Sequence, residues 1–141
     1  MNRAKLRECT FLLLFTNDFH EMNEIHKQFD MLMDNLEDIE AKEADKEYII
    51  NRAVDIVKNI AEIDTKINDV SVGWNTKRMS KVDLTILRLA YYEMKMDEDV
   101  PQKVAIDQAV ELAKKYGSDE SPSFVNGILA KVYQTEENTN N

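Results

Sequence analysis

Few residues of this 141-residue chain are of the types that carry out catalysis. It has one cysteine, Cys9, and two histidines, His20 and His26. A lone cysteine excludes an internal disulfide and a cysteine-based metal cluster. The histidines are six residues apart, so they do not share a helical face, and neither belongs to the His-Glu-x-x-His pattern of a zinc peptidase. We therefore expect two surface histidines and a small buried cysteine.

Other catalytic and cofactor patterns are also missing from the sequence. A di-iron helical bundle would need Glu-x-x-His pairs on two helices, and the sequence has none. Three scattered glycines cannot form a phosphate-binding loop or a dinucleotide turn. We therefore expect no catalytic residue, no metal and no cofactor, so the chain is predicted to be a binding protein rather than an enzyme.

The charge of the chain is strongly uneven. Lys and Arg number 18 against 27 Asp and Glu, which gives a formal net charge of −9. Residues 1–17 carry three basic residues and one acid, whereas residues 18–47 carry eleven acids and three lysines. Two further basic islands are Lys77-Arg78 with Lys81, and Lys114-Lys115. The net charge excludes a protein that coats RNA indiscriminately, but the islands could contact phosphate locally or only solvate helix faces.

The elements that position these residues are predicted to be helices. Apolar residues recur at helical spacing, no segment alternates with period two, and the chain has only 3 Gly and 2 Pro. The predicted helices cover residues 3–17, 21–36, about 45–72, a segment holding Leu84 to Met94, 101–116 and 122–134. We expect an all-α protein of six or seven helices in one compact bundle over residues 1–134, with a polar, frayed tail at 135–141.

Local signals set the expected helix ends. Asp45 is a plausible N-cap, and Asp64 could mark a kink or a second start in the long helix that follows. Ser80 and Asp83 match a capping box. Gly117 follows two lysines and is expected to end its helix in the left-handed conformation.

Exposed aromatic side chains would be needed to stack on single-stranded RNA. The candidates, most of which we expect in the core, are Phe15, Trp74, Tyr91, Tyr92, Tyr116, Phe124 and Tyr133. Adjacent helical residues point about 100° apart, so one of Tyr91 and Tyr92 is expected at an edge or an interface.

Several segments together resemble the NusB family of bacterial transcription antitermination factors. They are Ile86–Met94, Asp99-Val100-Pro101, Val104–Lys114, Phe124–Leu129 and the opening Arg7-Glu8-Cys9 that leads to Leu14-Phe15. The resemblance covers nearly the whole chain and implies seven helices in two subbundles. It also implies binding of boxA RNA together with NusE, a ribosomal protein of the small subunit. That complex joins RNA polymerase and other Nus factors, and some members form homodimers.

The resemblance assigns RNA contacts to two regions. The basic first helix of the family falls on Arg3, Lys5 and Arg7, which would contact phosphates. Phe15 stands where the family often has Tyr, and Phe124 matches an aromatic residue that opens the last helix. Both rings are expected base contacts.

The partner face follows from the same resemblance. Asp83 and Glu120 fall where members carry acids associated with NusE. Arg88 and Glu93 match the family signature, although Arg88 could instead belong to a structural ion pair. Compared with the family, the basic run is thinned by Ala4 and Leu6.

Two other functions are compatible with a NusB-like chain. It could be a helical interaction module that acts through proteins only. It could also be part of an RNA cytosine methyltransferase with a NusB-like domain, but the sequence ends at Asn141 without a cofactor-binding fold. No secretory signal is recognisable, and the longest apolar run, Phe11 to Phe15, is too short to span a bilayer. The expected location is the cytoplasm.

Overall fold

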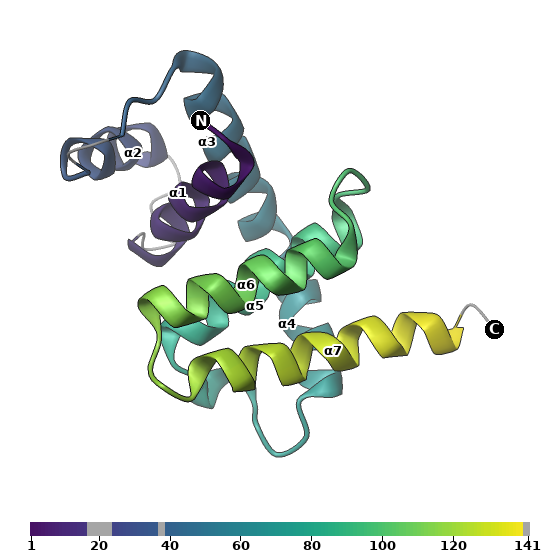
Figure 1. Cartoon of the computed structure of the whole chain (residues 1–141). Coiled ribbons are helices and arrows are strands. Elements are labelled where there is room, and N and C mark those ends of the chain that lie inside the picture. The colour runs from purple at the N-terminus through teal and green to yellow at the C-terminus, as the bar shows by residue number, and fades with distance from the viewer. Residues whose placement is uncertain (17–23, 37–38, 140–141) are drawn as a thin grey trace. The chain divides into compact units, whose positions relative to one another are not determined.

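The computed structural model describes residues 1–16, 24–36 and 39–139, and these residues form helices and connections without a strand. The all-α prediction is therefore confirmed (Figure 1). The helices are α1 (Arg3–Thr16), α2 (Ile25–Asp34), α3 (Glu43–Lys58), α4 (Ile60–Val70), the short 3-10 helix η2 (Thr76–Arg78), α5 (Lys81–Met96), α6 (Gln102–Tyr116) and α7 (Ser121–Thr139).

The chain divides into two compact units, and each is described by itself. The N-terminal unit is Met1–Lys58 and holds α1 to α3, and the C-terminal unit is Asn59–Asn141 and holds α4 to α7. This division agrees with the two subbundles that the NusB resemblance implies. A single domain over residues 1–134 stays a prediction.

In the N-terminal unit, α1 packs against both α2 and α3. The fully buried side chains at its centre include Phe11, Phe29 and Ile49, each at most 2% exposed. Cys9 is also fully buried, as expected for a small apolar residue. Burial, and next the Glu8 carboxylate, raise the pKa of its thiol, so little reactive thiolate forms near neutral pH.

The start of α3 differs from the prediction. The helix begins at Glu43, so Asp45 lies inside its first turn and is not the N-cap. Its Oδ2 accepts a hydrogen bond of 3.0 Å from the backbone N–H of Lys42. An acidic side chain that reaches back three residues to the capping residue performs the second half of a capping box. Asp45 therefore does stabilise the start of the helix, but from the third helical position and not from the N-cap position.

This contact makes the stability of the N-terminal unit depend on pH. The Lys42 N–H and the α-ammonium of Met1, 3.4 Å away, hold the pKa of Asp45 below its ordinary value. A carboxyl with a lowered folded-state pKa stabilises the fold above its unfolded pKa, near 4, and this contribution is lost as the pH falls through the folded pKa. Asp45→Asn should therefore lower the melting temperature at pH 7. The gap to wild type should shrink below about pH 4, as thermal melts across pH would show. A gap that does not vary with pH would contradict the assignment.

A break separates α3 from α4 at Asn59. This residue leaves helical geometry, with φ −105° and ψ 10°. The kink or second helix start predicted at Asp64 is misplaced, because the second helix begins at Ile60 and Asp64 lies within α4. Its carboxylate instead pairs with a side chain of α5, described below.

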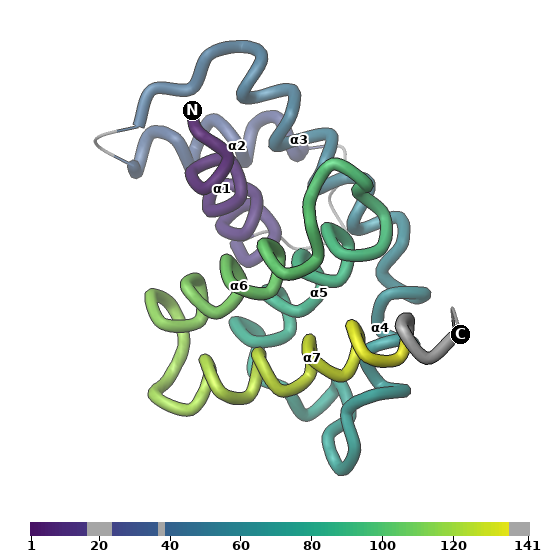
Figure 2. The backbone as a smooth tube through the Cα atoms, turned by 45° about the vertical axis from the view of Figure 1, so that its right-hand side comes forward, coloured from purple at the N-terminus to yellow at the C-terminus, as the bar shows by residue number. Residues whose placement is uncertain are grey.

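In the C-terminal unit, α5 packs against α4, α6 and α7 (Figure 2). Tyr91 and Tyr92 are 7% and 8% exposed, so the prediction that one of them lies at an edge is wrong. The reason is that three helices surround α5, which can therefore bury side chains in several directions. The Ser80 half of the predicted capping box is confirmed, because the Ser80 Oγ accepts a hydrogen bond of 3.1 Å from the backbone N–H of Asp83. The other half is not formed by the Asp83 Oδ1, which has no hydrogen-bond partner.

The end of α6 and the course of α7 also differ from the prediction. Gly117 has φ −93° and ψ −170°, so its backbone is extended and the predicted left-handed stop is wrong. The helix α7 continues through Thr139, beyond the expected end at residue 134. Residues 135–139 contain no proline or glycine, the two residue types that most strongly end a helix.

Candidate RNA and partner interface

The basic residues of α1 do not lie on one face. Arg3 and Arg7 are one turn apart and share a side of the helix, whereas Lys5 points about 200° away from Arg3. Arg3 is exposed, and Lys5 and Arg7 are partly exposed. The Asn2 Oδ1 accepts a hydrogen bond of 2.8 Å from the backbone N–H of Lys5 and so helps to cap the helix start. Two of the three predicted phosphate contacts therefore share one face.

Lys5 has a partner within its own helix. Its Nζ lies 3.0 Å from the Glu8 Oε1, and the Glu8 side chain is largely buried. This carboxylate offsets the positive charge that Lys5 would offer to a phosphate. The i, i+3 spacing of Lys5 and Glu8 is visible in the sequence and is sufficient to predict this pair.

The two predicted base contacts belong to different units. Phe15 lies near the end of α1 and is partly exposed, and its ring stacks on Phe11 with centroids 5.8 Å apart and an interplanar angle of 15°. Phe124 lies in the first turns of α7 and is also partly exposed. Its neighbour is Trp74, with ring centroids 5.9 Å apart and an interplanar angle of 76°. Nothing in the sequence indicates this aromatic pair, because its members are far apart along the chain.

The four predicted partner residues are all in the C-terminal unit, in three different settings. Asp83 lies in the first turn of α5, and its Oδ1 is buried without a hydrogen-bond partner. Glu120 is exposed immediately before α7. Glu93 is only 3% exposed, which leaves little of it for a partner to contact.

Arg88 forms the structural ion pair that was one of its two predicted roles. Its Nε and Nη2 donate hydrogen bonds of 2.8 and 2.7 Å to the two carboxylate oxygens of Asp64 in α4. Both side chains are mostly buried, with 15% and 21% of their surface exposed. This two-pronged contact ties α5 to α4, so Asp83 and Glu120 are the better placed of the four residues for contact with another protein.

The comparisons with known proteins agree with this architecture. Residues 4–134 match the sequence profile of the NusB family. The chain belongs to the NusB family. A NusB of Agathobacter rectalis, named transcription antitermination protein NusB, is 48% identical over 93% of this chain and 98% of its own length. A protein of the same name from Lachnoclostridium phytofermentans is 49% identical over 94% of this chain and 98% of its own length.

Solved NusB structures have the same fold. T. maritima NusB matches with a TM-score of 0.81 and 32% identity, over 95% of this chain and 92% of that chain. A structure of the antitermination factors NusB and NusE in complex with double-stranded RNA matches with a TM-score of 0.77 and 26% identity, over 96% and 99% of the two chains. The family and the helical architecture that the sequence predicted are therefore confirmed.

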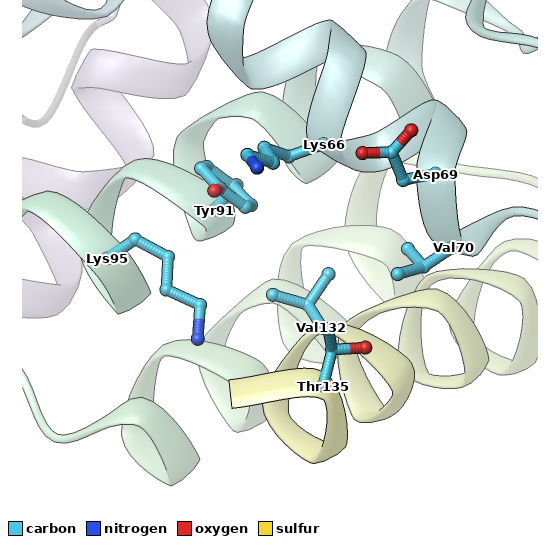
Figure 3. Close-up of a pocket in the computed structure, with 7 residues that line it drawn as sticks. All are labelled: Lys66, Asp69, Val70, Tyr91, Lys95, Val132 and Thr135. Atoms are coloured by element: carbon cyan, nitrogen blue, oxygen red, sulfur yellow. The ribbon is translucent and has the colours of Figure 1, made fainter. Parts of the chain in front are cut away.

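This NusB-family chain also has a cavity of about 280 Å³ at the end of α5 opposite Asp83. Figure 3 shows the amino group of Lys66 turned toward the ring of Tyr91, and Lys95 extending from α5 toward the part of α7 that carries Val132 and Thr135. The cavity is lined by Lys66, Asp69, Val70, Tyr91, Lys95, Val132 and Thr135. None of the predicted RNA or partner residues lines it.

The described residues contain neither a metal-binding cluster nor a membrane-spanning helix. In the described part of this NusB-family chain, no group of three or more His, Cys, Asp and Glu residues is arranged to hold a metal ion. His26 is exposed, and His20 lies outside the described residues. The described helices include none that is long and apolar enough to cross a membrane.

Proposed function

We propose that the chain is a transcription antitermination factor that binds boxA-type single-stranded RNA together with NusE. In this function it joins RNA polymerase and other Nus factors in the cytoplasm and supports processive transcription, notably of ribosomal RNA operons. The observation that carries the proposal is the family match over nearly the whole chain, to relatives named as antitermination proteins. The solved complex of NusB with NusE and RNA supports both kinds of partner.

The mechanism is recognition without catalysis. Arg3 and Arg7 share one face near the positive end of the α1 dipole, where phosphate oxygens are attracted. Phe15 and Phe124 keep part of their rings exposed for contact with bases. Few cations are available for phosphate contact, so binding by the chain alone should be weak and NusE should strengthen it.

The RNA role of α1 is tested by removing its two arginines together. Titrations of boxA-type RNA, with and without NusE, should be done at two salt concentrations. For Arg3→Ala/Arg7→Ala we expect weaker binding and a plot of log K against log salt that is shallower by about 1.4, which is about 0.7 for each lost contact with a single strand. Lys27→Ala/Lys58→Ala is the control, since it removes the same charge from exposed positions in the same unit. Equal behaviour of the two double variants would remove α1 from the RNA site.

The partner face is tested by charge reversal. Asp83→Lys should weaken NusE capture about tenfold, because a basic ribosomal protein would then meet a like charge. Glu120→Lys should act in the same direction, and Glu98→Lys, at an exposed acid of the α5–α6 connection, is the control. Surface plasmon resonance against immobilised NusE measures the effect. Unchanged affinity for Asp83→Lys would remove that residue from the proposed face.

The second candidate function is a helical interaction module that acts only through proteins. The offset of the Lys5 charge by Glu8 favours it, because it leaves α1 fewer cations for phosphate. Retained NusE capture with no RNA binding in either condition would establish this function instead. Sedimentation of the isolated chain would show whether it also forms the homodimer known from some family members.

A further inference from the structure

The cavity of about 280 Å³ in the C-terminal unit lies where α4, α5 and α7 meet (Figure 3). We propose that it binds a small organic anion, that is, a carboxylate or phosphate group on an apolar body of about one aromatic ring. We call it the Tyr91 cavity, and its lining residues are Lys66, Asp69, Val70, Tyr91, Lys95, Val132 and Thr135. The proposal goes beyond the proposed function, because it does not need the chain to bind RNA or NusE.

The walls of the Tyr91 cavity divide into an apolar floor and a polar rim. Tyr91 and Val132 are only 7% and 4% exposed and form the floor. Lys66, Asp69 and Thr135 are exposed and form the rim. Ligand pockets combine apolar walls with a few polar groups that orient the ligand, and most of them measure about 300–1,000 Å³. The size of this cavity therefore fits a single ring and not a dinucleotide.

Two lysines from different helices supply positive charge. The amino group of Lys66, on α4, turns inward over the ring of Tyr91, and Lys95 reaches across from α5 (Figure 3). The Lys95 Nζ donates a hydrogen bond of 3.2 Å to the Gln102 Oε1, and this neutral amide holds the ammonium without itself cancelling its charge. With the carboxylate of Asp69, the lining has a formal charge of +1 in a chain of −9. Such a lining favours an anion, which lysine binds as a point charge.

The helices that carry the lining are held together beside the cavity. The Arg88 guanidinium donates hydrogen bonds of 2.8 and 2.7 Å to the Asp64 carboxylate, which fixes α5 to α4. Lys66 follows Asp64 by two residues, and Tyr91 follows Arg88 by three, so the contact lies within one turn of both lining residues. Ile67 of α4 is fully buried next to Lys66. A site on packed helices needs little reorganisation to bind a ligand.

The position and depth of the cavity favour a small molecule over RNA. None of the predicted RNA contacts on α1 or at the start of α7 lines it. A single strand is bound through exposed rings on which bases stack, with cations along the backbone. The Tyr91 ring is buried at the floor, so a base that is still part of a strand has little of it to stack on. A free ligand of one ring can enter and contact the floor while its anionic group stays between the lysines.

Phenyl phosphate and benzoate are the probes, and each would be titrated into the isotope-labelled full chain while the amide resonances are recorded by NMR. We expect the largest shifts at residues 66–70, 91–95 and 132–135, with one dissociation constant for all three segments. Benzamide lacks the charge, inorganic phosphate lacks the apolar body, and benzylamine carries the opposite charge. Each of these should bind about tenfold more weakly or worse, because each loses either the charged hydrogen bonds or the apolar contact. Whichever probe binds more tightly identifies the anionic group.

Two variants with opposite expected effects test the lining. Lys66→Ala/Lys95→Ala should weaken phenyl phosphate binding about tenfold or more. Asp69→Asn should strengthen it about two- to threefold, because a like charge at the rim is removed. Lys103→Ala/Lys114→Ala removes the same charge as the first variant from exposed positions of the same unit and should change nothing. Circular dichroism melts would confirm that each variant is folded.

Each outcome supports or overturns the proposal. Shifts that scatter over the lysines of the chain, or an equal response to benzamide, would overturn it, since the first shows general attraction of anions and the second a merely apolar gap. If boxA-type RNA or NusE displaces phenyl phosphate and binds Lys66→Ala/Lys95→Ala more weakly, the cavity is a macromolecular contact and the small-ligand assignment is overturned. If the probes bind as expected while RNA and NusE binding fail, the proposed function is wrong and the Tyr91 cavity stands.

Discussion

Arg88→Ala should lower the free energy of unfolding by about 1–3 kcal/mol. The guanidinium makes two hydrogen bonds, of 2.8 and 2.7 Å, to the Asp64 carboxylate. Removing one member of a mostly buried ion pair leaves the other charge desolvated and without its partner, which costs more than the loss of an exposed pair. The remaining exposure of 15% and 21% lets water screen part of the charge, so we expect less than the loss for a fully buried pair. Urea denaturation would measure the change.

A double-mutant cycle identifies the origin of that loss. Asp64→Ala and the double variant complete the cycle, and contact between the two side chains should appear as a coupling energy of at least about 0.5 kcal/mol. Arg88→Lys keeps the charge but not the two-pronged geometry, so it should recover only part of the stability. Strictly additive losses would show that the pair contributes nothing as a pair.

The same variants decide between the two roles predicted for Arg88. If the residue acts only through Asp64, then Arg88→Ala and Asp64→Ala should change NusE affinity equally. If Arg88 also contacts the partner, Arg88→Ala should weaken capture more than Asp64→Ala at matched stability. The ion pair does not exclude a second role, so this measurement is needed.

Helix positions were largely predictable because apolar periodicity records which side of a helix is buried. The first predicted helix, residues 3–17, corresponds to Arg3–Thr16, and the fifth, 101–116, corresponds to Gln102–Tyr116. The errors concern residues whose type fits several local roles. Asp45 fits an N-cap by residue type but lies at the third helical position, because a carboxylate can accept backbone N–H groups at either place.

The candidate site was less predictable, since its geometry depends on contacts between distant segments. Nothing in the sequence pairs Trp74 with Phe124, or Arg88 with Asp64. The prediction for Tyr91 and Tyr92 failed for a related reason. Two adjacent residues can both be buried when several helices pack around their own helix, and the sequence does not show how many helices pack there. The Lys5–Glu8 pair could have been predicted, because its spacing is local.

Gly117→Ala should destabilise the C-terminal unit by about 1–2 kcal/mol. The backbone conformation does not require glycine, because φ is −93° and ψ is −170°. On that ground alone, alanine would stabilise the fold by about 0.4–1 kcal/mol by restricting the unfolded chain. The close approach of α7 makes the substitution destabilising instead. A Cβ at Gly117 would lie 2.5 Å from the Cβ of Ser121 and 2.8 Å from the carbonyl oxygen of Ala113.

These neighbours cannot move away easily. The Ala113 carbonyl already accepts the Gly117 N–H at 2.9 Å, and the Ser121 Oγ accepts the Ser118 N–H at 3.0 Å. Because Ser121 is only 2% exposed, overpacking at this turn should cost about 1–3 kcal/mol, more than the entropic gain.

Gly127→Ala is the matched control for this interpretation. Gly127 lies inside α7, and nothing stands within 4 Å of a Cβ built there. The Gly127→Ala variant should therefore have a free energy of unfolding higher by up to about 1 kcal/mol, because alanine is the better helix former. Opposite signs for two identical substitutions, measured by urea denaturation, would show that the α6–α7 turn requires glycine for space and not for backbone freedom. If Gly117→Ala also stabilised the fold, the turn would have to open without cost, and the tight contact between Gly117 and Ser121 would not hold α7 against α6.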